Sequence, residues 1–473
     1  MPIRHFVVLM LENRSFDAML GALRPAGAAF DGLTGAESNV WHQPGGAQQR
    51  IFAWNDPALD AAALCIPDPD PGELFADIDM QLRGLAADGS VNPGGPTMGG
   101  FVDNYMRQPA AAPAADPRAV MHHFTPAQLP VLSTLAQAFA VSDRWFAAAP
   151  CQTWPNRFFV HTGTAGGYVN NAPTHFPYEM PTVFNRLSDA GASWRIYFHD
   201  VPQAAALARL WGDALTGHFV RFADAFAQDA ANGSLPAYSF IEPRYFTAAL
   251  LGDIPNDAHP PHNVAFAEQL VATVYNALRG GPNWRETLLL VIFDEHGGCH
   301  DHVVPPAAVP PDGLAQDGFA FDRFGVRVPA VIVSPLVPAG SVLRPAGPTP
   351  FDHTSVIATL RRLHGFAPLT ARDAAAPDLL AVLGGTPDND GPAIVAARAV
   401  AAAPGQVAQA AARPPNDLQR SLAAAAVHLP TAGADVATHL ARLRGAVDVM
   451  PQHATVADAA ADVAAHVRGF LGR

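Results

Sequence analysis

The sequence predicts an α/β protein with a mainly parallel sheet covered by helices on both faces. Three short apolar segments are typical of buried strands: His5 to Leu11, Thr287 to Phe293 and Val328 to Val333. Two other segments, Val264 to Leu278 and Thr354 to His364, carry apolar residues at helical spacing. Strands that alternate with helices indicate a parallel sheet between helical layers.

The 473-residue chain is longer than most single domains, so we expect a large core with an appendage. We assign the core to residues 1–383 and an alanine-rich helical appendage to residues 384–473. Within the appendage, helices are predicted at Ala396 to Ala403, Asp417 to Val427 and Val456 to Leu471.

Two segments rich in proline, glycine and aromatic residues interrupt the predicted core. They run from Ala36 to Gly99 and from Gly163 to Pro260. Because proline and glycine break regular structure, we expect insertions and loops here that shape a pocket.

Charge and hydropathy limit which partners the protein is expected to bind and where in the cell it is expected. The formal net charge is −13 and no basic run stands out, which argues against binding to a nucleic-acid backbone. The apolar run from Phe6 to Leu11 is too short to cross a bilayer, and no transmembrane segment is predicted. No signal peptide is recognised, so we expect a cytoplasmic protein, with export by a route that needs no signal peptide as the alternative.

Two clusters of polar residues follow predicted strands directly. Glu12 and Asn13 follow the first strand, and Asp294 and Glu295 follow the second. Since the carboxyl ends of parallel strands meet at one sheet edge, we expect these side chains to converge. Carboxylates crowded together repel unless a cation or a proton intervenes. For the segment Glu12 to Asp17 alone, the alternative is an ordinary capped helix start.

A third cluster surrounds Thr153, which lies in the segment Pro150-Cys151-Gln152-Thr153-Trp154-Pro155. A hydroxyl held in a turn between two prolines is a candidate nucleophile. Asn156 and Arg157 follow it and are candidates for binding phosphate oxygens. The alternative is a turn with only a local structural role.

Taken together, these motifs resemble the bacterial phosphoesterase family of phospholipases C and related acid phosphatases. The resemblance runs from Ile3 to about Gly365. It rests on VVLMLENRSFD (7–17), MGGFVDNY (98–105), PCQTWPNRFF (150–159), IYFHD (196–200), NDAHPPH (256–262), LLLVIFDEHGGCHDHVVPP (288–306) and FDHTSVIATL (351–360), with a weaker likeness in NDLQRSL (416–422).

The resemblance implies an alkaline-phosphatase-like three-layer α/β/α sandwich that holds one divalent metal ion. It implies Thr153 as the nucleophile and assigns the metal to Glu12, Asn13, Asp294 and Glu295. Since all four ligand side chains offer oxygen, Ca²⁺ or Mg²⁺ is favoured, with Zn²⁺ as the alternative if a nearby histidine joins them.

The resemblance also places His199, His259 and His353 in the pocket, where an imidazole would protonate the departing alcohol. One position departs from the family pattern: Glu73 follows Asp68-Pro69-Asp70-Pro71-Gly72, where relatives usually have histidine. We therefore expect Glu73 at the substrate, in place of an imidazole.

The favoured function is that of a phospholipase C-type phosphodiesterase, with a phosphate-ester substrate that includes a phospholipid headgroup. Tyr105, Trp145 and Trp154 are candidates for an aromatic wall around a choline-like headgroup, or are ordinary core residues. The alternatives are an acid phosphatase that uses the same site and an inactive ligand-binding relative. A sulfatase-like enzyme is disfavoured, because the residues around Cys151 lack the spacing of its nucleophile motif.

Overall fold

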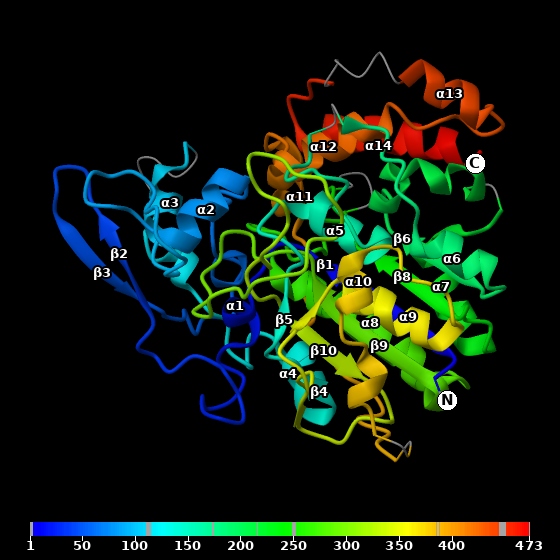
Figure 1. The fold of residues 1–473 in the computed structure, drawn as a ribbon, viewed down its shortest axis with the longest axis horizontal. Helices are drawn as coiled ribbons and strands as arrows, with labels where there is room; N and C mark the ends of the chain where they lie inside the picture. The colour runs from blue at the N-terminus through cyan, green and yellow to red at the C-terminus, as the bar shows by residue number, and fades with distance from the viewer. Residues whose placement is uncertain are drawn as a thin grey trace.

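An eight-stranded sheet forms the centre of the molecule (Figure 1). The computed structural model describes residues 3–109, 115–172, 175–214, 216–247, 252–384, 386, 388–443 and 451–472. In spatial order the strands are β11 (Ser341–Val342), β4 (Ala140–Val141), β10 (Ala330–Val333), β9 (Thr287–Phe293), β1 (His5–Leu11), β8 (Tyr238–Glu242), β6 (Trp194–Phe198) and β7 (Phe219–Arg221).

Five neighbouring strands of this sheet, β7, β6, β8, β1 and β9, run parallel, which confirms the predicted mainly parallel sheet. The first two predicted strands are found with the predicted bounds, as β1 and β9. The third is β10, and it runs antiparallel to β9. Its start therefore lies at the carboxyl ends of β1 and β9, which brings Arg327, three residues before it, to that edge.

The strands β8, β9 and β10 are buried at every residue, which shows that both faces of the sheet are covered. Two groups of helices pack among themselves and contact the strands. One group is α4 (Pro130–Ala138), α7 (Phe222–Asn232) and α8 (Val264–Gly280); the other is α5 (Thr153–Thr162), α6 (Val183–Asp189), α9 (Thr354–His364) and α10 (Ala371–Ala375). The predicted α/β class is thus confirmed.

Residues 36–107 form a lobe at the side of the sheet, at the left of Figure 1. The lobe holds an antiparallel hairpin of β2 (Ser38–His42) and β3 (Gln48–Phe52), with α2 (Phe75–Arg83) and α3 (Phe101–Arg107). The short helix α1 (Phe16–Leu20) connects β1 to the hairpin. The predicted insertion is therefore present, but it is more regular than a set of loops.

The prediction of loops for Gly163 to Pro260 is wrong. The described residues of this segment include three strands of the central sheet, β6, β7 and β8, together with α6 and α7. These strands have three to five residues each and lie between proline- and glycine-rich turns. Because the strands are short and turn residues flank them, the sequence pattern did not indicate them.

Among the described residues after 400, four helices lie together at the top of Figure 1. They are α11 (Pro404–Ala412), α12 (Asp417–Ala426), α13 (Val436–Leu443) and α14 (Val456–Leu471). The predictions at 417–427 and 456–471 are confirmed, whereas the helix predicted at Ala396 to Ala403 is absent. The segment is extended instead because Asn276 and Gln269 of α8 bond its backbone at Val395 and Val400.

The C-terminal helices share the core of the sheet. Leu418, Leu422, Val463 and Phe470 are buried in the same apolar cluster as the strands. Among the described helices, none is both long enough and apolar enough to cross a bilayer.

Candidate active site

Two neighbouring parallel strands end in acidic residues at the same edge of the sheet. Leu11 of β1 lies opposite Phe293 of β9, so Glu12 and Asp294 emerge side by side. The Asn13 backbone N–H donates a 2.8 Å hydrogen bond to Asp294 Oδ1. Glu12, Asn13, Asp294 and Glu295 are all fully buried. The structure thus brings the four predicted metal ligands together.

Asn13 is the centre of this group. Its amide Nδ2 donates to Glu73 Oε1 and to Glu295 Oε1, each over 2.7 Å. Its backbone is left-handed, with φ of 54°, a conformation that asparagine tolerates better than most residues. Such strain is common where a side chain must be aimed at a ligand. Glu73, expected at the substrate from the sequence, therefore lies inside the acidic group.

Thr153 is the first residue of α5, and its side chain points toward the same group. Its Oγ1 lies 3.3 Å from Asn13 Oδ1 and 3.5 Å from Glu12 Oε2. The hydroxyl is buried at the N-terminus of a ten-residue helix, where the backbone dipole favours negative charge. This position suits an oxygen nucleophile and the oxygens of a phosphoryl group whose phosphorus it would attack.

Arg157, predicted to bind phosphate, is placed differently. It lies one turn into α5 and forms a buried ion pair with Glu12 Oε1, and it also donates to the Met10 carbonyl. Gln203 Nε2 donates to the same Glu12 oxygen over 2.9 Å. Arg157 therefore compensates the charge of Glu12 from behind, and Oε2 is the Glu12 oxygen that faces Thr153.

Asn156, the second predicted phosphate ligand, braces the turn before the nucleophile. Its Oδ1 accepts the N–H of Ala149, and its Nδ2 donates to the carbonyls of Ala149, Cys151 and Gln152. Both the oxygen and the nitrogen of the Asn156 side chain are engaged in these hydrogen bonds. Its contribution in the structure is to hold Thr153 in place rather than to contact a substrate.

Burial and mutual repulsion perturb the carboxylates. Burial raises the pKa values of Glu12, Glu73 and Glu295 well above the usual range; neighbouring carboxylates add to the rise, whereas the charge of Arg157 opposes it at Glu12. Asp294 Oδ2 is buried without a hydrogen-bond partner. Crowded oxygens and an unsatisfied carboxylate oxygen are what a hard divalent cation would neutralise, so the residues fit such an ion.

His259 is the predicted histidine that reaches the acidic group. Its Nδ1 lies 2.7 Å from the Pro260 carbonyl, which can only accept, so Nδ1 carries the proton. Nε2 therefore presents a lone pair, 3.7 Å from Glu73 Oε1. Asp257 holds this turn by accepting the His259 backbone N–H. Burial lowers the pKa of His259 to about 4, so a proton donor on Nε2 is disfavoured.

His353 and His199 each donate a hydrogen bond to a backbone carbonyl. Trp145 Nε1 donates to His353 Nδ1, and His353 Nε2 donates to the Asp294 carbonyl over 2.5 Å. Both ring nitrogens are thus engaged, and His353 braces Asp294 from behind. His199 follows β6, where its Nδ1 donates to the Glu242 carbonyl and its ring stacks on Phe222. These contacts occupy both ring nitrogens of His353 and the Nδ1 of His199, and the proton-donor role expected of the two histidines stays a prediction.

The predicted aromatic wall is also absent. Tyr105, Trp145 and Trp154 are almost completely buried. Trp145 stacks on Phe351, and Trp154 packs on Tyr178. They are core residues, which was the alternative interpretation.

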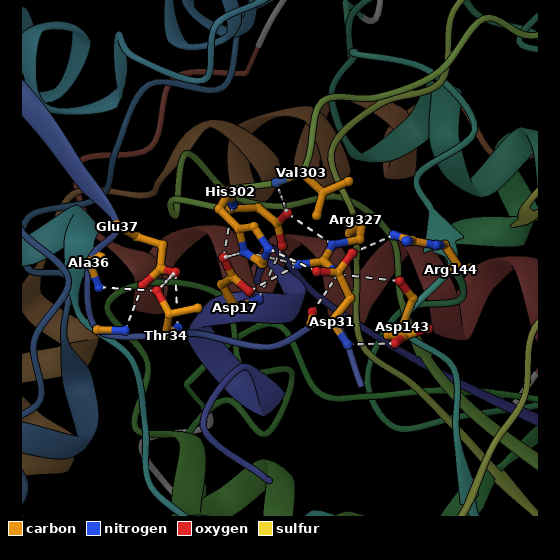
Figure 2. Close-up of polar contacts among 12 residues, drawn as sticks. Asp17, Asp31, Thr34, Ala36, Glu37, Asp143, Arg144, His302, Val303 and Arg327 are labelled. Carbon is orange, nitrogen blue, oxygen red and sulfur yellow. Dashed lines mark hydrogen bonds and ion pairs between the residues drawn. The ribbon is translucent and has the colours of Figure 1, made fainter. Parts of the chain in front are cut away.

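A buried charge network supports the site from the side of α1 (Figure 2). Arg327 is completely buried and forms ion pairs with Asp17 and Asp301. His302 contacts Asp17 through Nδ1 and Asp31 through Nε2, over 2.7 and 3.2 Å. The network ties the segment after β1 to the segment after β9. Because Arg327 already lies between its carboxylates, it is a structural cluster rather than a cation site.

Sequence reasoning missed three residues of the site: Asp70, Gln203 and Asp257. Asp70 and Asp257 stand inside the motifs DPDPG and NDAHPPH, so their signal was present but unused. Gln203 follows β6 in the segment predicted to be loop, and no sequence signal marks it.

With this geometry established, comparison with known proteins identifies the family. Residues 3–367 match the Phosphoesterase family. The chain belongs to this family. It is 39% identical to non-specific phospholipase C1 of Arabidopsis thaliana over 393 residues, which covers 79% of this chain and 69% of the relative. It is 29% identical to phospholipase C B of Mycobacterium tuberculosis over 433 residues, covering 80% and 77%.

This family member is therefore a phosphoric ester hydrolase of the phospholipase C type. The resemblance to a bacterial family was too narrow, because the relatives include plant proteins. Among solved structures, a protein of the alkaline phosphatase superfamily from Vibrio parahaemolyticus is similar at 14% identity, with a TM-score of 0.33 over 53% of this chain and 64% of that one. The lipoteichoic acid synthase LtaP of Listeria monocytogenes gives a TM-score of 0.35 at 14% identity, over 54% and 70%.

Proposed function

We propose that the chain hydrolyses phosphodiesters of the phospholipid class, with Thr153 as nucleophile and one divalent cation as cofactor. The observation that carries this proposal is the position of the Thr153 hydroxyl. It stands at the N-terminus of α5, within 3.5 Å of oxygens from Glu12 and Asn13. A single buried hydroxyl facing a group of carboxylates has no evident structural purpose.

Glu12, Asn13, Asp294 and Glu295 would hold the cation. When bound, it would supply Lewis-acid polarisation of the phosphoryl oxygens and lower the pKa of the Thr153 hydroxyl. The all-oxygen ligand set favours Ca²⁺ or Mg²⁺.

The chain's own residues orient the reaction. Asn13 Oδ1 and Glu12 Oε2, 3.3 and 3.5 Å from the Thr153 hydroxyl, are the acceptors for its single proton, which leaves the lone pairs of Oγ1 free for attack on phosphorus. Attack of Oγ1 on phosphorus forms a phosphoryl ester on Thr153 and breaks the bond to the leaving oxygen, and the proton lost by Thr153 ends on the departing alcohol. Water then attacks the phosphorus, the bond to Oγ1 breaks, and a proton from that water returns to Thr153. Asn156 keeps the nucleophile in place, and the charge of Arg157 opposes the rise in the pKa of Glu12 that burial causes.

Two observations favour a lipid substrate. The relatives include phospholipases C of a plant and of a mycobacterium. In addition, Asp68 and Pro261, which are two residues from Asp70 and His259, line a cavity of about 730 Å³. Leu59, Leu64, Ile66 and Phe266 also line it. These apolar residues offer contacts to the acyl part of a phospholipid, and Asp68, Arg118 and Arg413 share the wall with them.

Parallel assays of p-nitrophenyl phosphorylcholine and p-nitrophenyl phosphate test the proposal. We expect diester turnover that EDTA abolishes and added Ca²⁺ or Mg²⁺ restores. Thr153→Ala should lose turnover, whereas Thr153→Ser, which keeps the hydroxyl, should retain part of it. Faster turnover of the monoester would instead indicate an acid phosphatase, and full activity of Thr153→Ala would rule out the proposed nucleophile.

A further inference from the structure

A second group of ligand-type atoms lies next to the four proposed metal ligands. Asp70, Glu73 and His259 each offer one such atom, and these atoms lie within 4.8 Å of one another. Asn13 joins the two groups, since its amide donates to Glu73 on one side and to Glu295 on the other. The second group is thus separate from, and adjacent to, the first.

The atoms of this group face one another without a proton between them. His259 is completely buried, and its Nε2, a lone pair in the neutral ring, has no hydrogen-bond partner. Glu73 Oε1 lies 3.7 Å away, which is too far for a hydrogen bond. Asp70 Oδ1 is also buried without a hydrogen-bond partner, and it lies 3.7 Å from Nδ1 of the same ring. Three electron-pair donors that converge on one another, two of them unsatisfied, call for a cation.

The charge balance of the region points the same way. Five carboxylates converge there, from Glu12, Asp70, Glu73, Asp294 and Glu295. The buried Arg157 pairs with Glu12, and the charge of the buried Arg14 acts on Asp70. One divalent ion would leave an excess of negative charge where an anionic phosphodiester must bind. A second divalent ion would remove that excess.

We propose that Asp70, Glu73 and His259 bind a second divalent cation beside the first. Two carboxylates with one imidazole suit Mn²⁺ or Zn²⁺ better than Ca²⁺. The second ion would act in the same reaction as the first, so its role rests on the proposed function. Two adjacent cations are a common arrangement in phosphoryl-transfer enzymes, where together they bind the oxygens of the reacting group.

Counting bound Mn²⁺ tests the inference. The full-length protein is stripped with EDTA and dialysed against MnCl₂, and bound manganese is measured by mass spectrometry. We expect two ions per chain in the wild type and one in Glu73→Gln. Asp70→Asn should also bind one, and because the Asp70 side chain is one-quarter exposed, this variant is expected to fold. The matched control is Glu268→Gln. Glu268 is a fully buried glutamate that accepts hydrogen bonds from the first backbone N–H groups of α4, and this variant should bind two manganese ions.

The outcomes separate this inference from the proposed function. One manganese per chain in the wild type, or two in both Glu73→Gln and Asp70→Asn, would overturn the second site. If the wild type binds one ion and still hydrolyses the diester through Thr153, the second site fails and the function stands. If it binds two ions and cleaves no diester, the function fails and the second site stands.

Discussion

Gly297 packs directly against the backbone carbonyl of Asn13. A Cβ atom added at Gly297 would lie 2.2 Å from the Asn13 carbonyl oxygen. The segments after β1 and β9 touch here, with Gly297 at a φ of 56°. Any side chain at position 297 would push Asn13 away from Thr153, Glu73 and Glu295. The geometry of the site therefore depends on a glycine that performs no chemistry.

Gly297→Ala is expected to lower kcat by about 100-fold, the effect of displacing a reacting group by roughly 1 Å. The matched control is Gly191→Ala. Gly191 also has a positive φ, of 70°, but an added Cβ there would meet nothing within 4 Å. The control should lose only about 1–2 kcal/mol of unfolding free energy, the cost of a left-handed backbone at alanine, and should keep its activity. Steady-state kinetics and thermal unfolding of both variants check this; equal activity of the two would contradict the role given to Gly297.

Arg157→Met is expected to destabilise the fold, because it leaves Glu12 as a buried charge without its partner. Breaking a buried pair from one side costs about 3–5 kcal/mol. Urea unfolding in the presence of EDTA measures the loss. The double variant Arg157→Met with Glu12→Gln should regain part of it, and a double variant no more stable than the single one would refute the pairing.

Stability is expected to fall between pH 6.5 and 9 because of His302. Burial opposes its charge, but the hydrogen bond to Asp17 and the charges of Asp17 and Asp301 prevail and raise its pKa to about 9. A raised pKa stabilises the fold fully below the unfolded value, near 6.5, and that contribution disappears as the pH rises through 9.

The loss amounts to at most about 3 kcal/mol, from roughly 1.4 kcal/mol per pKa unit. Urea unfolding at several pH values measures it. His302→Gln should have lower stability at pH 6.5 and a flatter profile up to pH 9. An unchanged slope in this variant would show that another group titrates.

Leu422→Ala is expected to destabilise the whole molecule in one transition. Leu422 of α12 is buried in the same apolar cluster as the strands, so the cavity should cost about 2–5 kcal/mol. Calorimetry distinguishes this result from that of an independent appendage. In the latter case, a separate early transition would appear while the remaining transition stayed in place.

The sequence sufficed where a residue's position follows from a strand end. Glu12 and Asp294 were placed correctly because β1 and β9 are long apolar strands and parallel strands end at one edge. Thr153 was marked by its prolines and by its motif. The directions of side chains were not predictable: Arg157 and His353 turn to Glu12 and to the Asp294 carbonyl, partners more than 50 residues away along the chain. Gln203 depends on β6, a five-residue strand hidden among turns.

The most direct test of the central claim is acid quenching of the enzyme during turnover of a short-chain phosphatidylcholine, followed by mass spectrometry of the peptide that contains Thr153. The account predicts a phosphorylcholine adduct on Thr153 that forms within one turnover and is absent after EDTA treatment. Turnover with no adduct on this peptide, together with an active Thr153→Ala variant, would contradict it.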